Sequence, residues 1–159
     1  MNISPMNAID ARLAELGIDL PTAMAPVANY VPYAVTGNLV VVSGQLPAVD
    51  GKVAVVGKVG VEVSVEQGQH AARLCFINVL THLRQACGGD LGRVRRVVRL
   101  GGFIASPPDF TQHAAVMNGA SDLAVAVFGE AGRHARSTIG VPALPLGGAV
   151  EVEGLFETD

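Results

Sequence analysis

The sequence predicts one α+β domain, in which a mixed β-sheet carries two helices packed on one of its faces. Two stretches with apolar residues at helical spacing, 64–87 and 106–128, alternate with runs rich in β-branched residues. The resulting order is hairpin, helix, strand, helix, strand, strand. A length of 159 residues suits one domain with a core of its own. We place this domain at residues 27–159, preceded by a short helix and an extended connector over 1–26.

Three helices are expected from their end signals. Ser4 and Pro5 suit the N-cap and first position of an amphipathic helix that ends at Gly17. Ser64 with Gln67 three residues later forms a capping box at the start of the best-supported helix. The run Ser106-Pro107-Pro108-Asp109 predicts the start of a third helix, which ends at Gly129.

The strands are expected in five places. Two β-rich runs between Tyr30 and Gln45 flank the turn residues 36–38 and predict a hairpin, and a short strand is expected after Asp50-Gly51. Further strands are expected over 94–104, 137–141 and 149–156. In the last one, Val150 and Val152 alternate with Glu151 and Glu153, so the two carboxylates share one face of the sheet.

Composition excludes several classes of protein. The apolar runs are far shorter than the ~18 residues that a membrane-spanning helix needs, and the N-terminus lacks the basic start of a signal peptide. We therefore expect a cytoplasmic protein without membrane contact. A net charge of -3 disfavours nucleic acid as a partner. Cys75 and Cys87 lie too far apart along one predicted helix to bond each other, and both are expected to be buried.

Common catalytic motifs do not fit this chain. The stretch 51–58 departs from the spacing of a phosphate-binding loop, and the four histidines lack the spacing of a helical zinc site. No glycine precedes Ser43 as a nucleophile elbow requires. The basic run from Arg93 to Arg99 has no stacking aromatic residues between its arginines, so a solvated or ion-paired strand is favoured over a nucleic-acid surface.

Several blocks taken together resemble the RidA family, also called YjgF or endoribonuclease L-PSP. The resemblance covers about residues 27–156, and the ordered spacing of the blocks makes it more specific than any one of them. The blocks are Tyr30, Thr36-Gly37-Asn38, Ser43-Gly44-Gln45, Ala135-Arg136-Ser137, Ala143-Leu144-Pro145 and Val150-Glu151-Val152-Glu153.

The resemblance implies a chorismate-mutase-like fold, a homotrimer with ligand clefts between subunits, and hydrolysis of reactive enamines and imines to 2-keto acids and ammonia. It implies no metal and no other cofactor. Arg136 matches the arginine that holds the carboxylate of a small acid metabolite, and a planar guanidinium suits that task. Glu151 matches the glutamate that places or deprotonates the attacking water. The matching cleft positions are Tyr30, Ser43, Gly44, Asn118, Ser137 and Thr138.

Departures from the family pattern leave alternatives open. His134 replaces a small residue or proline, Pro142 replaces a small or basic residue, and Thr138 stands where several members carry a cysteine. Arg136 and Glu151 on adjacent strands could also form an ordinary ion pair. The alternative functions are a non-catalytic trimer that binds keto-acid-like metabolites and, third, a single-stranded RNA endoribonuclease or translation inhibitor.

Overall fold

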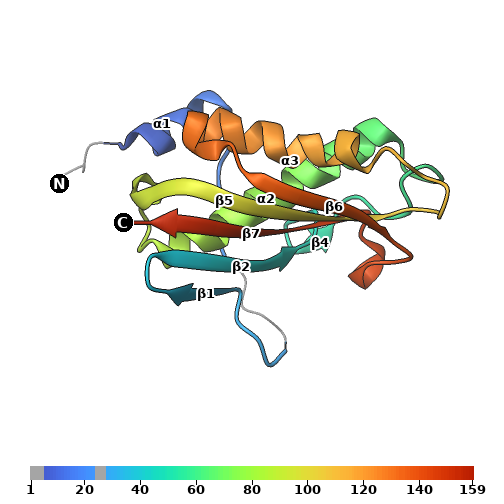
Figure 1. Cartoon of the computed structure of the whole chain (residues 1–159), viewed down its shortest axis with the longest axis horizontal. Coiled ribbons are helices and arrows are strands. Elements are labelled where there is room, and N and C mark those ends of the chain that lie inside the picture. Colours follow the sequence, from blue (N-terminus) through green and yellow to red (C-terminus); the bar gives the residue numbers. More distant parts are fainter. Residues whose placement is uncertain (1–5, 24–27) are drawn as a thin grey trace.

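A five-stranded mixed sheet forms the centre of the molecule in the computed structural model, which describes residues 6–23 and 28–159 (Figure 1). The strand order is β1-β2-β7-β5-β6, with only the β5–β6 pair parallel. The strands are β1 (Tyr33–Thr36), β2 (Leu39–Gln45), β5 (Val94–Ala105), β6 (Ala135–Val141) and β7 (Val150–Thr158). The predicted α+β class is confirmed.

Helices α2 (Val65–Ala86) and α3 (His113–Phe128) pack against each other and against one face of this sheet (Figure 1). The short helix α1 (Ala8–Glu15) contacts α3. Three 3₁₀ turns, η1 (Leu91–Arg93), η2 (Gly129–Gly132) and η3 (Pro145–Gly147), complete the helical elements of the described ranges. No helix within those ranges has both the length and the apolar character needed to cross a bilayer.

Strand β7 shows how the core is built, because buried and partly exposed residues alternate along its whole length. Val150, Val152 and Phe156 are fully buried beneath the helices, together with Leu100 of β5 and Val40 of β2. Glu151 and Glu153 point to the other face, as their alternation with valine predicted. Val41 and Ile139, which share that other face, are 46% and 52% exposed.

The predicted capping box of α2 is confirmed. Ser64 Oγ accepts a hydrogen bond from the Gln67 amide at 3.1 Å, and Gln67 Oε1 accepts one from the Ser64 amide at 2.8 Å. The helix ends one residue earlier than expected, since Cys87 is its C-cap and not part of it. Cys75 and Cys87 are both buried and unbonded, as predicted.

One predicted helix start differs from the structure, and another lies outside the described residues. Helix α3 begins at His113 and not at Ser106, because each proline of the Pro107-Pro108 pair disfavours helical dihedral angles in the residue before it. The segment forms a turn instead, in which the Phe110 amide donates to the Pro107 carbonyl. The expected start at Ser4-Pro5 lies outside the described residues. Helix α1 begins at Ala8, where the Asn7 side chain caps it by accepting from the Asp10 amide.

The short strand predicted after Asp50-Gly51 is present as half of a second, two-stranded sheet. Strands β3 (Ala48–Val49) and β4 (Lys52–Val53) pair across a tight turn. Both turn residues, Asp50 and Gly51, have positive φ angles of 51° and 78°, which Asp and Gly tolerate better than most residues. This hairpin packs against α2 and helps to enclose a cavity that is described below.

Candidate functional site

A bulge in β2 exposes the first group of site residues. The register between β2 and β7 shifts between Val42 and Gln45, so Ser43 and Gly44 together stand opposite the single residue Glu153. The Ser43 hydroxyl donates to the Val31 carbonyl at 2.7 Å, and the Ser43 amide donates to the Pro32 carbonyl. The bulge is therefore tied to the segment that leads into β1, which also carries Tyr30.

Gly44 is required by the position of the Glu151 side chain. A Cβ atom at position 44 would collide with the Glu151 carboxylate and would lie 2.9 Å from its Cδ. The backbone of Gly44 does not have a positive φ angle, so space and not backbone conformation selects glycine here. Glu151 therefore lies over the bulge on the sheet face away from the helices.

The environment of Glu151 favours its protonated form. Partial burial raises the pKa of this carboxyl above its ordinary value of 4.5, and the negative charge of Glu153 raises it further. Glu153 itself lies 3.6 Å from Arg99 Nη1, on the neighbouring strand. A carboxylate with a raised pKa is a better proton acceptor than an ordinary surface glutamate.

Arg136 is held on the opposite face of the sheet, at the edge where β6 meets α3. It pairs in register with Leu100, which is buried beneath the helices. Its Nη1 donates to Asn118 Oδ1 at 2.9 Å and to Ser121 Oγ at 3.0 Å, and its Nη2 lies 3.4 Å from the Ala114 carbonyl. These three partners follow one another on one stripe of α3, at spacings of four and three residues.

The hydrogen-bond network of Arg136 extends to His134. His134 Nδ1 lies 2.6 Å from the Gly132 carbonyl, and Nε2 lies 2.9 Å from Ser121 Oγ. Because a carbonyl only accepts, Nδ1 carries a proton, and in the neutral form of the ring Nε2 accepts from the Ser121 hydroxyl. Ser121 thereby directs its hydroxyl proton to His134 and its lone pairs to Arg136.

Thr138 lies two residues beyond Arg136 on the same face of β6. Its Oγ1 is buried and has no hydrogen-bond partner among the described residues. An unpaired buried hydroxyl costs about 1–3 kcal/mol, so most such groups in proteins have partners. Because it shares a strand face with Arg136, Thr138 belongs to the Arg136 group.

The predicted site residues thus form two groups on opposite faces of one chain. Arg136, Thr138 and Asn118 lie on the helical side, whereas Glu151, Ser43 and Gly44 lie on the other side. Ser137 is exposed and shares the Glu151 face, and Tyr30 is 55% exposed in the segment before β1. The residues do not converge in a single chain.

The expectation that Arg136 and Glu151 occupy adjacent strands is wrong. β5 lies between β6 and β7, and the two side chains project from opposite faces. An ion pair between them within one chain, left open by the sequence, is therefore excluded by geometry. Ser121 and His134 were not identified as site residues. The helical spacing of Ser121 from Asn118 was the signal available for the first of them.

An α+β chain with helices on one sheet face, an arginine network on that side and a partly buried glutamate on the other defines the class of this protein. Residues 10–157 match the family model described as "YjgF/chorismate_mutase-like, putative endoribonuclease". The chain belongs to this YjgF/RidA family, as its sequence blocks indicated.

Individual relatives agree with that assignment. The chain is 48% identical to Protein TCP17 of Trypanosoma cruzi over 158 residues, which is 99% of this chain and 98% of that protein. It is 49% identical to protein Atu1372 of Agrobacterium tumefaciens, with a TM-score of 0.90 over 95% of this chain and 92% of the other. RidA from the Antarctic bacterium Psychrobacter shares 27% identity, with a TM-score of 0.58 over 87% and 97% of the two chains.

The raised pKa of Glu151 predicts a pH-dependent effect of the substitution Glu151→Gln on stability. The folded state holds this proton more tightly than the unfolded state, so wild-type stability falls as pH rises from about 4.5 through the folded pKa. Glutamine has no charge to bury. In denaturant titrations, Glu151→Gln should match wild type below pH 4.5 and gain stability relative to it as pH rises. A difference that is the same at all pH values would contradict this account.

The Arg136 network predicts a specific response to Ser121→Ala. Removing the hydroxyl takes one acceptor from Arg136 and, among the described residues, the donor to His134 Nε2, at a cost of about 1 kcal/mol in unfolding free energy. Ring-¹⁵N spectra should show the His134 proton on Nδ1 in both proteins, because the Gly132 carbonyl remains, and a shifted Nε2 resonance in the variant, whose Nε2 has lost its hydrogen-bond donor. Ser121→Thr keeps the hydroxyl and should behave as wild type. An unchanged ring spectrum in Ser121→Ala would refute the network.

Proposed function

We propose that this protein hydrolyses small imine and enamine acids to 2-keto acids and ammonia, in clefts formed between copies of the chain. The observation that carries the proposal is the state of Arg136. A guanidinium has five N–H donors, and three of them are directed to Asn118, Ser121 and Ala114. Two donors remain, which is the number that one carboxylate takes in a bidentate pair.

The second part of the site is Glu151, and its position argues for a cleft between chains. Because Glu151 and Arg136 lie on opposite faces, one substrate reaches both only if they come from different copies. The face that carries Glu151 also exposes Val41 and Ile139, and burial of such apolar area favours association. A closed ring of three copies would place one Arg136 beside a neighbour's Glu151 at each boundary.

The proposed chemistry uses only water and these two side chains. Arg136 holds the substrate carboxylate, so that the imine carbon next to it lies near the Glu151 of the neighbouring copy. Glu151 accepts a proton from water as the water oxygen attacks that carbon of the protonated imine, whose nitrogen thereby becomes a neutral amine. The carbinolamine then collapses: Glu151 returns its proton to the amine nitrogen and takes the proton of the hydroxyl, the C–N bond breaks, and ammonia leaves a 2-keto acid. An enamine substrate first gains a proton at its β-carbon to become the imine.

A non-catalytic binder of keto acids is the second candidate, because it needs Arg136 but not Glu151. Retained binding of a 2-keto acid together with no effect on imine decay would select it. The RNA-directed alternative finds less support. Arg93 and Arg95 are within 4 Å of Asp159, and Arg99 is near Glu153, so three of the four clustered arginines already have acidic partners.

The proposal predicts that the wild-type protein accelerates the decay of freshly generated 2-iminobutanoate to 2-oxobutanoate. Arg136→Ala and Glu151→Gln should each reduce kcat/KM by about a hundredfold or more, as expected for loss of a substrate clamp or a general base. Arg133→Ala is the matched control, since Arg133 is exposed and, within the described part of the chain, its side chain pairs only with Glu130. Wild-type protein that leaves the decay unchanged would refute the proposal.

Mixing the two inactive variants tests whether the site is shared between copies. When Arg136→Ala and Glu151→Gln chains are unfolded and refolded together, about one quarter of the boundaries should join an intact Arg136 to an intact Glu151. About one quarter of wild-type activity should then return. If each site were formed within one chain, the mixture would stay inactive.

The contact between Gly44 and Glu151 predicts that the substitution Gly44→Ala lowers activity much more than it lowers stability. A methyl group in Gly44→Ala displaces the Glu151 carboxylate, which is the mobile end of a side chain. We expect a loss of no more than about 1 kcal/mol in stability, since the end of the side chain can move, but at least a tenfold fall in kcat. Gly37→Ala, where a Cβ meets no atom within 4 Å but φ is 58°, should lose about 1–2 kcal/mol in stability to backbone strain and keep its activity, which controls for the effect of lower stability on kcat. A Gly44→Ala variant with full activity would contradict the placement of Glu151.

A further inference from the structure

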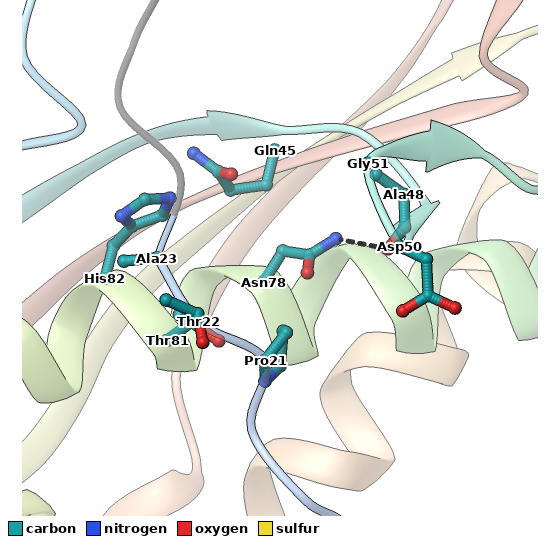
Figure 2. Close-up of a pocket in the computed structure, with 10 residues that line it drawn as sticks. All are labelled: Pro21, Thr22, Ala23, Gln45, Ala48, Asp50, Gly51, Asn78, Thr81 and His82. Carbon is teal, nitrogen blue, oxygen red and sulfur yellow. Dashed lines mark hydrogen bonds between the residues drawn. The ribbon is translucent and has the colours of Figure 1, made fainter.

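A cavity lies away from Arg136, between α2, the β3–β4 hairpin and the connector that follows α1 (Figure 2). Its volume is about 440 Å³, which is within the usual range for small-molecule sites. Asp50 stands at one end of the cavity and His82 at the other, with Asn78 and Gln45 between them (Figure 2). None of these four residues belongs to the Arg136 group.

The side-chain amides of this cavity offer acceptors. Asn78 Nδ2 donates to the Leu46 carbonyl and to the Ala48 carbonyl, both at 3.0 Å. Both amide hydrogens are therefore used, the orientation of the amide is set, and Oδ1 is left as an acceptor. Gln45 Nε2 donates to the Ser43 carbonyl at 3.0 Å, so Oε1 of Gln45 is also left to accept.

Two further groups add to this acceptor character. The Asp50 carboxylate lines the cavity, and a carboxylate only accepts hydrogen bonds. His82 is 7% exposed, and burial lowers the pKa of its imidazole, so the ring is neutral and one ring nitrogen is an acceptor. Its Nδ1 has no hydrogen-bond partner among the described residues. The Thr81 hydroxyl, in contrast, is already used by the Ile77 carbonyl.

Lysine and arginine are absent from the described lining of the cavity, whereas acceptors come from four different side chains. We infer that this cavity binds a small organic molecule that carries a protonated amine, with its ammonium group near Asp50. The opposite specificity, for a carboxylate, is excluded because the acceptors and the Asp50 charge repel it. The inference is independent of the proposed deamination, which uses residues on other surfaces.

Gln45 connects this cavity to the bulge of β2. Its Nε2 holds the carbonyl of Ser43, and its backbone follows Gly44, on which the position of Glu151 depends. A ligand that draws Gln45 Oε1 into the cavity therefore also changes the hydrogen bond between the Gln45 side chain and the Ser43 carbonyl in the bulge.

The test uses n-butylammonium as the probe, titrated into the full-length ¹⁵N-labelled protein at pH 7. Butyrate and butanol serve as charge controls of the same length. We expect saturable shifts of the Gly51 amide and of the side-chain amides of Asn78 and Gln45 with butylammonium alone. Asp50→Asn keeps the shape of the residue and tolerates the positive φ angle of 51° at this turn. It should weaken binding about fivefold, which is typical for loss of one exposed charge contact.

Two further variants complete the test. Asp109→Asn makes the same change of charge at an exposed position outside the cavity and should leave binding as in wild type. Ala48→Leu fills the cavity and should abolish the shifts, with a thermal melt to show that the fold is retained. The inference is overturned if butylammonium gives no saturable shifts, if butyrate binds equally well, or if Asp50→Asn binds as tightly as wild type.

Discussion

The alternation of buried and open residues along β7 is the constraint on which the rest of this structure depends. Val150, Val152 and Phe156 must face the helices, because these apolar side chains complete the core. The pleat of the strand then forces Glu151 and Glu153 to the other face. A shift of one residue would bury two carboxylates and expose the core, so the register has no close competitor. The side of the sheet on which Glu151 lies is thus a consequence of core packing.

The bulge in β2 and the edge of β6 are the two places where polar side chains are positioned on this sheet. The extra residue in the bulge leaves Val40 and Val42 in the core and Gln45 on the helical side, while Gly44 makes room for Glu151. At the edge of β6, one stripe of α3 supplies the acceptors that orient Arg136. Each half is rigid on its own, since it is built on strands and a long helix. The two halves meet only if a second copy of the chain brings them together.

The sequence predicted correctly those elements that are determined by interactions between residues close together in the chain. The capping box of Ser64 and Gln67, the hairpin turn after Thr36 and the alternation of Val150 to Glu153 all act within a few residues. The start of α3 was misplaced because Ser106 and Asp109 are good end signals, whereas the Pro107-Pro108 pair favours an extended path. Arg136 and Glu151 were recognised as candidates by resemblance. Their separation by β5 depends on strand order, which no local signal carries.

The sequence by itself determined the class of fold, the positions of most helices and strands, and the family. Each of these depends on the spacing of residues over short stretches of the chain. Only the tertiary structure decided that Arg136 and Glu151 lie on opposite faces, that Ser121 links Arg136 to His134, and that Asp50, Asn78 and His82 enclose one cavity. These relations join residues from different elements. They arise from the order in which strands pair and the faces on which helices pack, which are properties of the whole core and not of any one segment.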